Sequence, residues 1–535
     1  MDRKVVHPMK RFMKFSLLFV LCVGILCACG KKGTSNEAVV DETMDEIPVL
    51  SIDTVGDNAG NMDFVTKPVA RHVAKSIASW TQGYVMPPEP YYVDCTISLT
   101  DIDEKVVLDK VEAEVKVRGN WTTSYDKKPL RIKFKKAQSM LGLNEGQAFK
   151  SWVLLAEYKD GSMLRNKTAL TIAGEILESD GLYVSDVELV EVVINGEYWG
   201  VYLLAEQQQI NKGRVNITEA EDDYTGTDIG YFLEFDGYYK NEDPLQRFKI
   251  SYADNAALVP FDGEGGNGRT MKCLSDPAYG YKQDIGITIK SDIYSQEQQD
   301  FVASYLDNVY KIMYYAAYHD EAYVFSEDYT EISKTDKLTP KEAVEQVIDV
   351  QSLVDVYIIN ELFCDADVYY SSFFMAVDFG TEGDKKLRFE APWDFDSGLG
   401  NKDRCLDGTG FYAANIVPDV EGGPNGGGHY ETINPWLAVL IYEDWMQETI
   451  RKTWTEAYDA GVFDRAFAMI EEDKTRCQAA FTRNYNKWNN IINNAPFVNE
   501  LSPVAAACTN QEEAADFLLE WLQSRVEFLN GEWHE

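Results

Sequence analysis

Acidic side chains stand between apolar runs in the stretch from residue 360 to 401, NELFCDADVYYSSFFMAVDFGTEGDKKLRFEAPWDFDSGLGN. Asp365 and Asp367 follow one apolar run, and Asp394 and Asp396 lie near the other end. Between these clusters, two runs of aromatic and β-branched residues flank a group of turn residues, which predicts a hairpin. The ends of one hairpin lie close together, and converging carboxylates require a cation or a shared proton. We therefore expect the fold to place a cation or a shared proton at these clustered carboxylates.

In an alternative interpretation, the acidic residues have a structural role and form no functional site. Asp is common in turns, so the WDFD quartet could be a turn with Trp393 packed against it. Two clusters separated by a strand pair, the second followed by Gly398 and Gly400, favour a site. The spacing alone does not define the reaction.

The N-terminal segment carries targeting signals rather than fold. Basic residues precede the apolar run Phe15–Leu26, which is too short to span a membrane and is flanked like a signal peptide. The run ends in LCACG, which resembles a bacterial lipobox and predicts lipidation of Cys29; a plain secretory signal is the alternative. We therefore expect a lipoprotein signal peptide over 1–29 and a flexible polar tether over 30–46. This arrangement predicts an extracytoplasmic protein that is lipid-anchored to the cell membrane.

Composition excludes several classes of function. The formal net charge of −38 argues against nucleic-acid binding, which needs Lys and Arg to displace phosphate counterions. It suits either a soluble acidic surface or a basic partner. The chain has 9 Cys without a CxxC pair and only 5 His, so neither a zinc site nor a His-based metal site is expected. One or two disulfides fit an exported protein, but the sequence does not pair them.

The residue pattern over 47–240 predicts a β-rich lobe that is mostly antiparallel and contains one helix. The clearest local signal is a hairpin formed by the runs 187–194 and 198–205 around Asn195-Gly196, a pair typical of a type I′ turn. The one helix is expected over 162–177, with Ser162 as its N-cap.

The residue pattern over 241–535 predicts a helical lobe, which contains the acidic stretch. The sequence Thr339-Pro340-Lys341-Glu342 matches a capping box and is expected to open a helix that runs to about Phe363. Further helices are expected over 296–318, 445–460, 464–486 and 511–530. The expected fold class is α+β.

Five stretches together resemble the spore-coat CotH kinase family. They occur in the family's order: RGNWTTSYDKKPLRIKF (118–134), KSWVLLAEYKDGSMLRNKTAL (150–170), VVINGEYWGVYLLAEQ (192–207), NELFCDADVYYSSFFM (360–375) and APWDFDSGLGN (391–401). The resemblance implies a divergent protein-kinase-like fold with a β-rich N-terminal lobe and a helical C-terminal lobe. It also implies phosphate transfer from ATP, with Mg²⁺, to protein Ser.

The resemblance assigns roles to the acidic residues. Asp367 occupies the position of the catalytic-loop Asp, and Asp394 that of the metal-binding Asp, with Asp396 as a second metal ligand. One departure stands out, because kinases carry a metal-binding Asn five residues after the catalytic Asp and this chain carries Ser372. A hydroxyl is a poorer Mg²⁺ ligand than an amide oxygen, so the activity is expected to use one metal ion or to be weak.

The resemblance also suggests a nucleotide-binding set. Lys133 is the candidate for contacting phosphate, and Arg118 and Asn120 are expected in a loop near the nucleotide. Arg165, at the start of a helix, is expected to reach phosphate, and Glu175 to orient Lys133. Two other glutamates compete for that last role: Glu157 and Glu206.

Three functions remain in competition. The leading one is a protein Ser/Thr kinase at the cell surface that acts on a basic, Ser-containing protein and touches the membrane only through its lipid anchor. The second is a pseudokinase or binding lipoprotein that recognises a basic protein or a carbohydrate, which Ser372 favours. The third is a glycoside hydrolase with paired carboxylates among aromatics, which the resemblance makes the least favoured.

Overall fold

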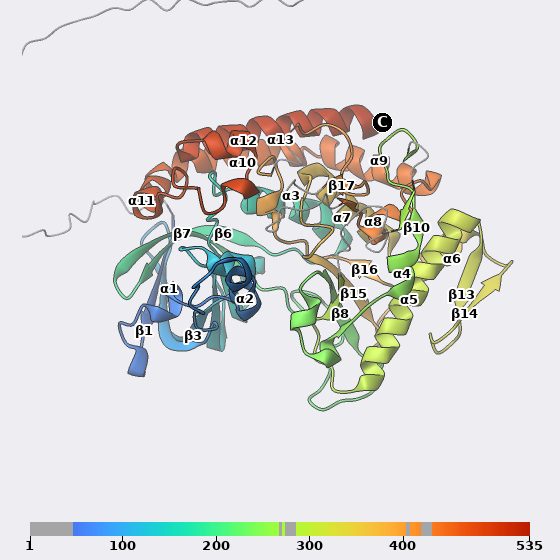
Figure 1. Cartoon of the computed structure of the whole chain (residues 1–535), viewed down its shortest axis with the longest axis horizontal. Coiled ribbons are helices and arrows are strands. Elements are labelled where there is room, and N and C mark those ends of the chain that lie inside the picture. Colours follow the sequence, from blue (N-terminus) through green and yellow to red (C-terminus); the bar gives the residue numbers. More distant parts are fainter. Residues whose placement is uncertain (1–46, 267–269, 273–284, 403–406, 419–430) are drawn as a thin grey trace, which may run out of the picture. The chain divides into compact units, whose positions relative to one another are not determined.

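The structure is a computed structural model that describes residues 47–266, 270–272, 285–402, 407–418 and 431–535. The fold is α+β, with a β-rich N-terminal region followed by a region dominated by helices (Figure 1). This confirms the predicted fold class at that level. The predicted signal peptide, the tether and Cys29 lie outside the described residues.

Seven strands close into a barrel in the order β1-β2-β3-β4-β5-β7-β6. All neighbours are antiparallel except β1 and β6, whose parallel pairing closes the barrel. In β2, side chains alternate between buried and more exposed, which is the period-2 pattern of a strand with one face on a core. The barrel strands are β1 (Val49–Thr54), β2 (Val93–Thr100), β3 (Val106–Val117), β4 (Leu130–Gln138), β5 (Phe149–Leu155), β6 (Val187–Ile194) and β7 (Glu197–Glu206).

The predicted hairpin at Asn195-Gly196 is confirmed. β6 and β7 pair antiparallel across this turn, and both turn residues have positive φ, 51° and 77°. Positive φ at both central positions is what a type I′ turn requires. Two short helices that the sequence analysis did not single out also lie in this region: α1 (Asp63–Thr66) and α2 (Arg71–Trp80).

A second sheet of five strands carries the acidic stretch. Its order is β16-β15-β8-β12-β9, and the pairing of β15 with β16 confirms the hairpin predicted between the two acidic clusters. β8, grouped by the sequence analysis with the first lobe, pairs with β15 instead. The strands are β8 (Gly230–Asp236), β9 (Arg247–Phe248), β12 (Gly286–Ile289), β15 (Phe373–Asp378) and β16 (Arg388–Phe389). Three two-stranded pairs complete the β-structure: β10 (Ala257–Leu258) with β11 (Met271–Lys272), β13 (Ala322–Phe325) with β14 (Ile332–Thr335), and β17 (Val417–Pro418) with β18 (Glu431–Thr432).

The helices pack mainly against one another. In Figure 1, α13 runs beside α9 and α10, and these helices contact α3 and α7 beneath them. The helices after α2 are α3 (Arg165–Leu177), α4 (Ser251–Asn255), α5 (Gln296–His319), α6 (Pro340–Glu345), α7 (Val350–Phe363), α8 (Pro435–Ala438), α9 (Asp444–Asp459), α10 (Val462–Arg476), α11 (Gln478–Trp488), α12 (Pro503–Ala507) and α13 (Gln511–Trp533).

The helix expected over 339–363 is two helices. The capping box is present, since Thr339 Oγ1 accepts from Glu342 N and the Glu342 carboxylate accepts from Thr339 N. However, α6 ends at Glu345, and α7 starts afresh with Asp349 as its N-cap. Between them the backbone pairs with Leu387: Asp349 N donates to the Leu387 carbonyl, and Leu387 N donates to the Val347 carbonyl, which interrupts the helix there.

Two further predictions on helix ends were wrong. Ser162 does not cap α3, because the Asp160 carboxylate accepts from Ser162 N and from Arg165 N, the first residue of the helix. The helix expected over 464–486 is α10 followed by α11, separated at Cys477.

The four cysteines with described surroundings are all buried: Cys95, Cys364, Cys477 and Cys508. In the described part of the chain, no helix is long and apolar enough to span a bilayer.

Candidate active site

Asp394 begins a tight turn that neighbouring elements hold in place. Its backbone is left-handed, with φ 73° and ψ 49°, and the 3-10 turn Phe395–Ser397 follows. The N–H of residue 395 donates to Asn166 Oδ1 of α3 at 2.8 Å. Gly398 is required because a Cβ there would lie 2.8 Å from the Phe363 carbonyl oxygen at the end of α7. Left-handed backbone at a non-glycine residue is unfavourable and is concentrated at functional sites.

Asp367 lies in the turn that follows α7. The helix ends at Cys364 in a left-handed conformation, and Asp365 Oδ1 then accepts from Asp367 N at 3.1 Å. Lys402 Nζ lies 3.3 Å from Asp367 Oδ1. Asp365 therefore shapes the turn, whereas the Asp367 carboxylate remains partly exposed.

The two acidic turns converge, as the hairpin predicted. Ser372 Oγ donates to Asp394 Oδ2 at 3.3 Å. Burial, followed by the nearby charges of Asp396 and Asp367, raises the pKa of Asp394 to about 7, although two cations oppose the shift. The carboxylates of Asp396 and Asp367 thus disfavour the ionised form of Asp394.

Lys159 is the lysine at this cluster. It lies between β5 and α3, and its Nζ lies 2.8 Å from Ser397 Oγ, 3.4 Å from Asp396 Oδ1 and 3.9 Å from Glu500 Oε2. Burial lowers the pKa of Lys159, but the charges of Asp396, Tyr125 and Glu500 outweigh burial and raise it well above its usual value. Lys159 therefore stays protonated although it is only 7% exposed.

Glu157 links this lysine segment to α3. Its carboxylate accepts from Asn166 Nδ2 at 3.1 Å, and Asn166 is the residue that holds the Asp394 turn. Burial, followed by the charges of Asp160 and Asp396, raises the pKa of Glu157 well above its usual value. The glutamate coupled to the acidic turns is therefore Glu157, one of the two alternatives to Glu175.

Arg118 lies beside the cluster, and Asn120 lies near the surface. The Arg118 guanidinium is 5.9 Å from the centre of the Trp393 ring. Burial lowers the pKa of Arg118, while the charge of Asp394 raises it. Asn120 is exposed at the start of the 3-10 turn Trp121–Ser124.

The remaining predicted residues have other surroundings. Lys133 is exposed on β4, opposite Glu114 on β3 and Ser151 on β5. Glu175 forms an ion pair with Arg465 of α10. Arg165 is buried, pairs with Asp160, and donates through Nε to the Leu399 carbonyl at 3.2 Å. It thus holds the loop after the Asp394 turn.

Sequence reasoning missed three residues of this site. Lys159 and Glu500 were not considered, and Glu234 of β8 was read only as part of a strand. Glu234 Oε1 accepts from Ser372 N at 3.1 Å, which places a further carboxylate beside the cluster. The available signal was Lys159 itself, a charged residue directly after an apolar strand and before a helix, inside a stretch that resembles the CotH family.

The carboxylates do not form a preassembled metal cage. In the described residues, no group of three or more His, Cys, Asp or Glu side chains is gathered tightly enough to hold a metal ion. The oxygen donors of Asp394, Asp396 and Ser372 are nonetheless of the kind that Mg²⁺ prefers. Mg²⁺ typically takes one or two protein carboxylates together with substrate phosphates, and this donor set fits that pattern.

Fold and site together define an α+β protein with a partly buried acidic cluster and a lysine paired to it. A family model described as CotH kinase protein matches residues 115–529. This chain therefore belongs to the CotH kinase family, which suggests a kinase-like function. No curated protein matches the chain.

Proposed function

We propose that this protein is an ATP- and Mg²⁺-dependent protein Ser/Thr kinase of the CotH type. The single observation that carries the proposal is the convergence of Asp367, Asp394 and Asp396 on one partly buried region together with Lys159 and Arg118. Phosphoryl transfer relies on positioning and on charge stabilisation, so it needs both signs of charge at one place.

The roles follow from the position of each side chain. Asp367 would accept the proton of the acceptor Ser hydroxyl as that oxygen bonds to the γ-phosphorus and ADP leaves. Its carboxylate suits this because it is partly exposed, so that an acceptor hydroxyl can reach it. Asp394 and Asp396, with Ser372 beside them, would hold Mg²⁺, which when bound would offset negative charge on the phosphate oxygens.

Lys159 suits the phosphate-contacting role better than Lys133. It remains charged next to the proposed metal ligands, whereas Lys133 is exposed on the barrel. Arg118 would supply a second positive charge near Asp394. In this arrangement Glu157 and Asn166 would keep α3 and the Asp394 turn in register.

The proposal extends to the fold and to the location. The barrel would act as the N-terminal lobe of a divergent kinase, and the helices with the second sheet would act as the C-terminal lobe. We further propose lipid anchoring through Cys29 at the outer face of the cell membrane, with a basic, Ser-containing protein as substrate and no nucleic-acid partner. Membrane fractionation of a Cys29→Ala variant tests the anchor, which is excluded if the processed variant still sediments with membranes.

A second candidate is a pseudokinase that binds a basic protein or a carbohydrate without transferring phosphate. The observation that favours it is Ser372, which stands where kinases carry a metal-binding Asn. Its hydroxyl already donates to Asp394. Only a transfer measurement separates the two candidates, because a pseudokinase can also bind nucleotide.

Binding of Mg²⁺-ATP tests the site directly. We expect Mg²⁺-ATP to raise the Tm of the wild-type protein and to leave the Tm of Asp394→Asn unchanged, because Asn keeps the shape but lacks the charge that offsets the cation. Asp384→Asn is the matched control, since Asp384 is exposed in the loop between β15 and β16. An equal Tm increase in Asp394→Asn and wild type would remove Asp394 from the proposed metal site.

A further inference from the structure

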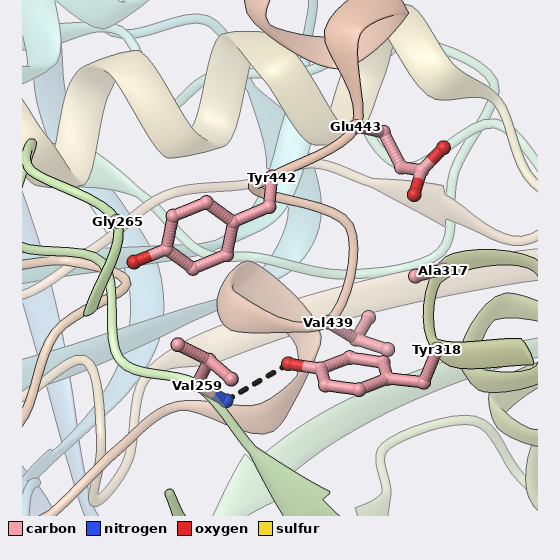
Figure 2. A pocket seen from close by; sticks show the side chains of 7 residues that line it. All are labelled: Val259, Gly265, Ala317, Tyr318, Val439, Tyr442 and Glu443. Carbon is pink, nitrogen blue, oxygen red and sulfur yellow. Dashed lines mark hydrogen bonds between the residues drawn. The ribbon is translucent and has the colours of Figure 1, made fainter. Parts of the chain in front are cut away.

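A cavity of about 280 Å³ lies where the end of α5 meets the α8–α9 connection. Figure 2 shows it bordered by the rings of Tyr318 and Tyr442, with the Glu443 carboxylate at one side. Aliphatic side chains complete its walls: Val259, Ala317 and Val439. Among the described residues, no side chain of the acidic site lines this cavity.

The two tyrosines are fixed by hydrogen bonds to the backbone of one segment. Tyr318 Oη accepts from Val259 N at 2.9 Å, as drawn in Figure 2, and Tyr442 Oη donates to the Pro260 carbonyl at 2.6 Å. These bonds fix the positions of both hydroxyls, and both tyrosines line the cavity. Both rings are held in place before any ligand arrives, which lowers the entropic cost of binding.

Glu443 adds one negative charge to this apolar space. Its Oε2 accepts from Trp445 Nε1 at 3.0 Å. Burial raises the pKa of Glu443, and the neighbouring charges that act on it belong to Asp444 and Asp320, which are also acidic. A positively charged group in the cavity would therefore meet a carboxylate, two aromatic rings and a locally negative field.

We propose that this cavity binds a Lys or Arg side chain of a basic protein partner. Cavities that take drug-sized ligands start at about 300 Å³, so this one suits a single long side chain rather than a nucleotide. The aliphatic shaft would lie against Val259, Ala317 and Val439, and the cationic end would lie near Glu443 and the tyrosine rings. The net charge of −38 favours the approach of a basic chain.

This site is separate from the proposed phosphotransfer site, and the test keeps them apart. The probe is a fluorescein-labelled peptide of alternating Lys and Ala, which has no hydroxyl to phosphorylate, and its binding is followed by fluorescence anisotropy without ATP or Mg²⁺. We expect Glu443→Gln to weaken binding about fivefold or more, and Tyr442→Leu to weaken it as well. Glu448→Gln removes the same charge from an exposed position on α9 and is expected to leave the affinity unchanged.

Two further measurements test whether the cavity recognises the positive charge of the lysine side chain. The same peptide with acetylated lysines should bind much more weakly, and n-butylammonium should compete with the unmodified peptide. Equal affinities of wild type and Glu443→Gln, with both folded by circular dichroism, would overturn the proposal. A peptide affinity lost in Asp394→Asn but kept in Glu443→Gln would also overturn it, by moving the peptide to the acidic site.

Discussion

Besides Asp396 and Ser397, a glutamate far away in the chain contributes to the charge and position of Lys159. Glu500 lies 3.9 Å from Lys159 Nζ and accepts hydrogen bonds from Tyr125 Oη and Trp121 Nε1, both near the start of β4. A buried charge such as that of Lys159 is stabilised by a partner that further hydrogen bonds hold in place, as they hold the partly exposed Glu500 here. Glu500 is thus a positioning residue for Lys159.

We therefore expect Glu500→Gln to lower kcat for phosphotransfer about tenfold, with a smaller change in the KM for ATP. Gln keeps an oxygen that accepts from Tyr125 and Trp121, so the fold should be retained. Glu512→Gln, at an exposed position on α13, is the control. Steady-state kinetics of the three proteins make the comparison, and an unchanged kcat would show that Lys159 does not need Glu500.

Asp355 in α7 is a buried carboxyl whose titration should make stability depend on pH. Burial raises the pKa of Asp355 from its usual 3.8 to about 8, although a hydrogen bond from Gln351 opposes this. At a pH between these two pKa values, Asp355 is protonated in the folded protein and ionised in the unfolded chain. Below about pH 4, the buried, protonated Asp355 therefore does not lower the free energy of unfolding. As the pH rises from about 4 to about 8, the free energy of unfolding falls by at most about 1.4 kcal/mol per pH unit.

Asp355→Asn should remove this loss, because Asn carries no charge at any pH. We expect the free energy of unfolding of the variant, relative to wild type, to increase between pH 5 and pH 8 in urea titrations. Asp384→Asn should show no such trend. Parallel pH profiles for Asp355→Asn and wild type would mean that Asp355 is ionised in the folded protein at neutral pH.

The sequence predicted that the acidic residues converge, but not which lysine lies beside them. Asp367, Asp394 and Asp396 were predictable because one short hairpin brings them together, and hairpins are local in sequence. Lys133 fits a strand pattern equally well on either face, and the burial of its neighbours turns it outward. Lys159 and Glu500 meet only through tertiary packing, which no local pattern contains.

At the scale of elements, α7 and α13 are joined by a fully buried ion pair. Arg525 Nη2 lies 2.7 Å from Glu361 Oε1, and both side chains are 0% exposed. Arg525 Nη1 also donates to the carbonyls of Gly408 and Gly410 at 3.0 and 2.7 Å. Because α7 leads directly into the Asp367 turn, this pair secures the end of the helix from which the site is built.

Arg525→Met should destabilise the protein by about 3–5 kcal/mol, because it leaves the Glu361 charge buried without its cation. Arg451→Met is the control, since Arg451 pairs near the surface with Glu535 and should cost at most about 1 kcal/mol. Denaturant unfolding measures both. A loss below about 1 kcal/mol in Arg525→Met would show that Glu361 is protonated or solvated once its partner is gone.

The sequence predicted a helix start that has a side-chain cap, but it did not predict where a helix is interrupted. The capping box at Thr339 is a local signal and was confirmed. The break between α6 and α7 arises because residues 347–349 bond to Leu387, a contact across about forty residues. Likewise, Asp160 displaced Ser162 as the cap of α3 because its carboxylate reaches several N–H groups at once.

At the scale of the whole molecule, the strand pattern predicted sheet but not closure. The barrel closes through the parallel pairing of β1 with β6, which joins residues 49–52 to residues 191–194. Alternation along a strand indicates which face is buried, not which distant strand is its neighbour. For the same reason β8 was assigned to the first lobe, although it forms the centre of the second sheet.

The central claim is phosphate transfer to Ser at the acidic cluster, and a radiolabel assay tests it most directly. Wild type, Asp367→Ala and Asp384→Asn are incubated with γ-labelled ATP, Mg²⁺ and a Lys- and Ser-rich peptide, with the Ser-to-Ala peptide as blank. We predict label on the Ser peptide from wild type and Asp384→Asn, and at least about a hundredfold less from Asp367→Ala, which should still bind Mg²⁺-ATP. Equal label from wild type and Asp367→Ala, or none from a wild type that binds Mg²⁺-ATP tightly, would contradict the account.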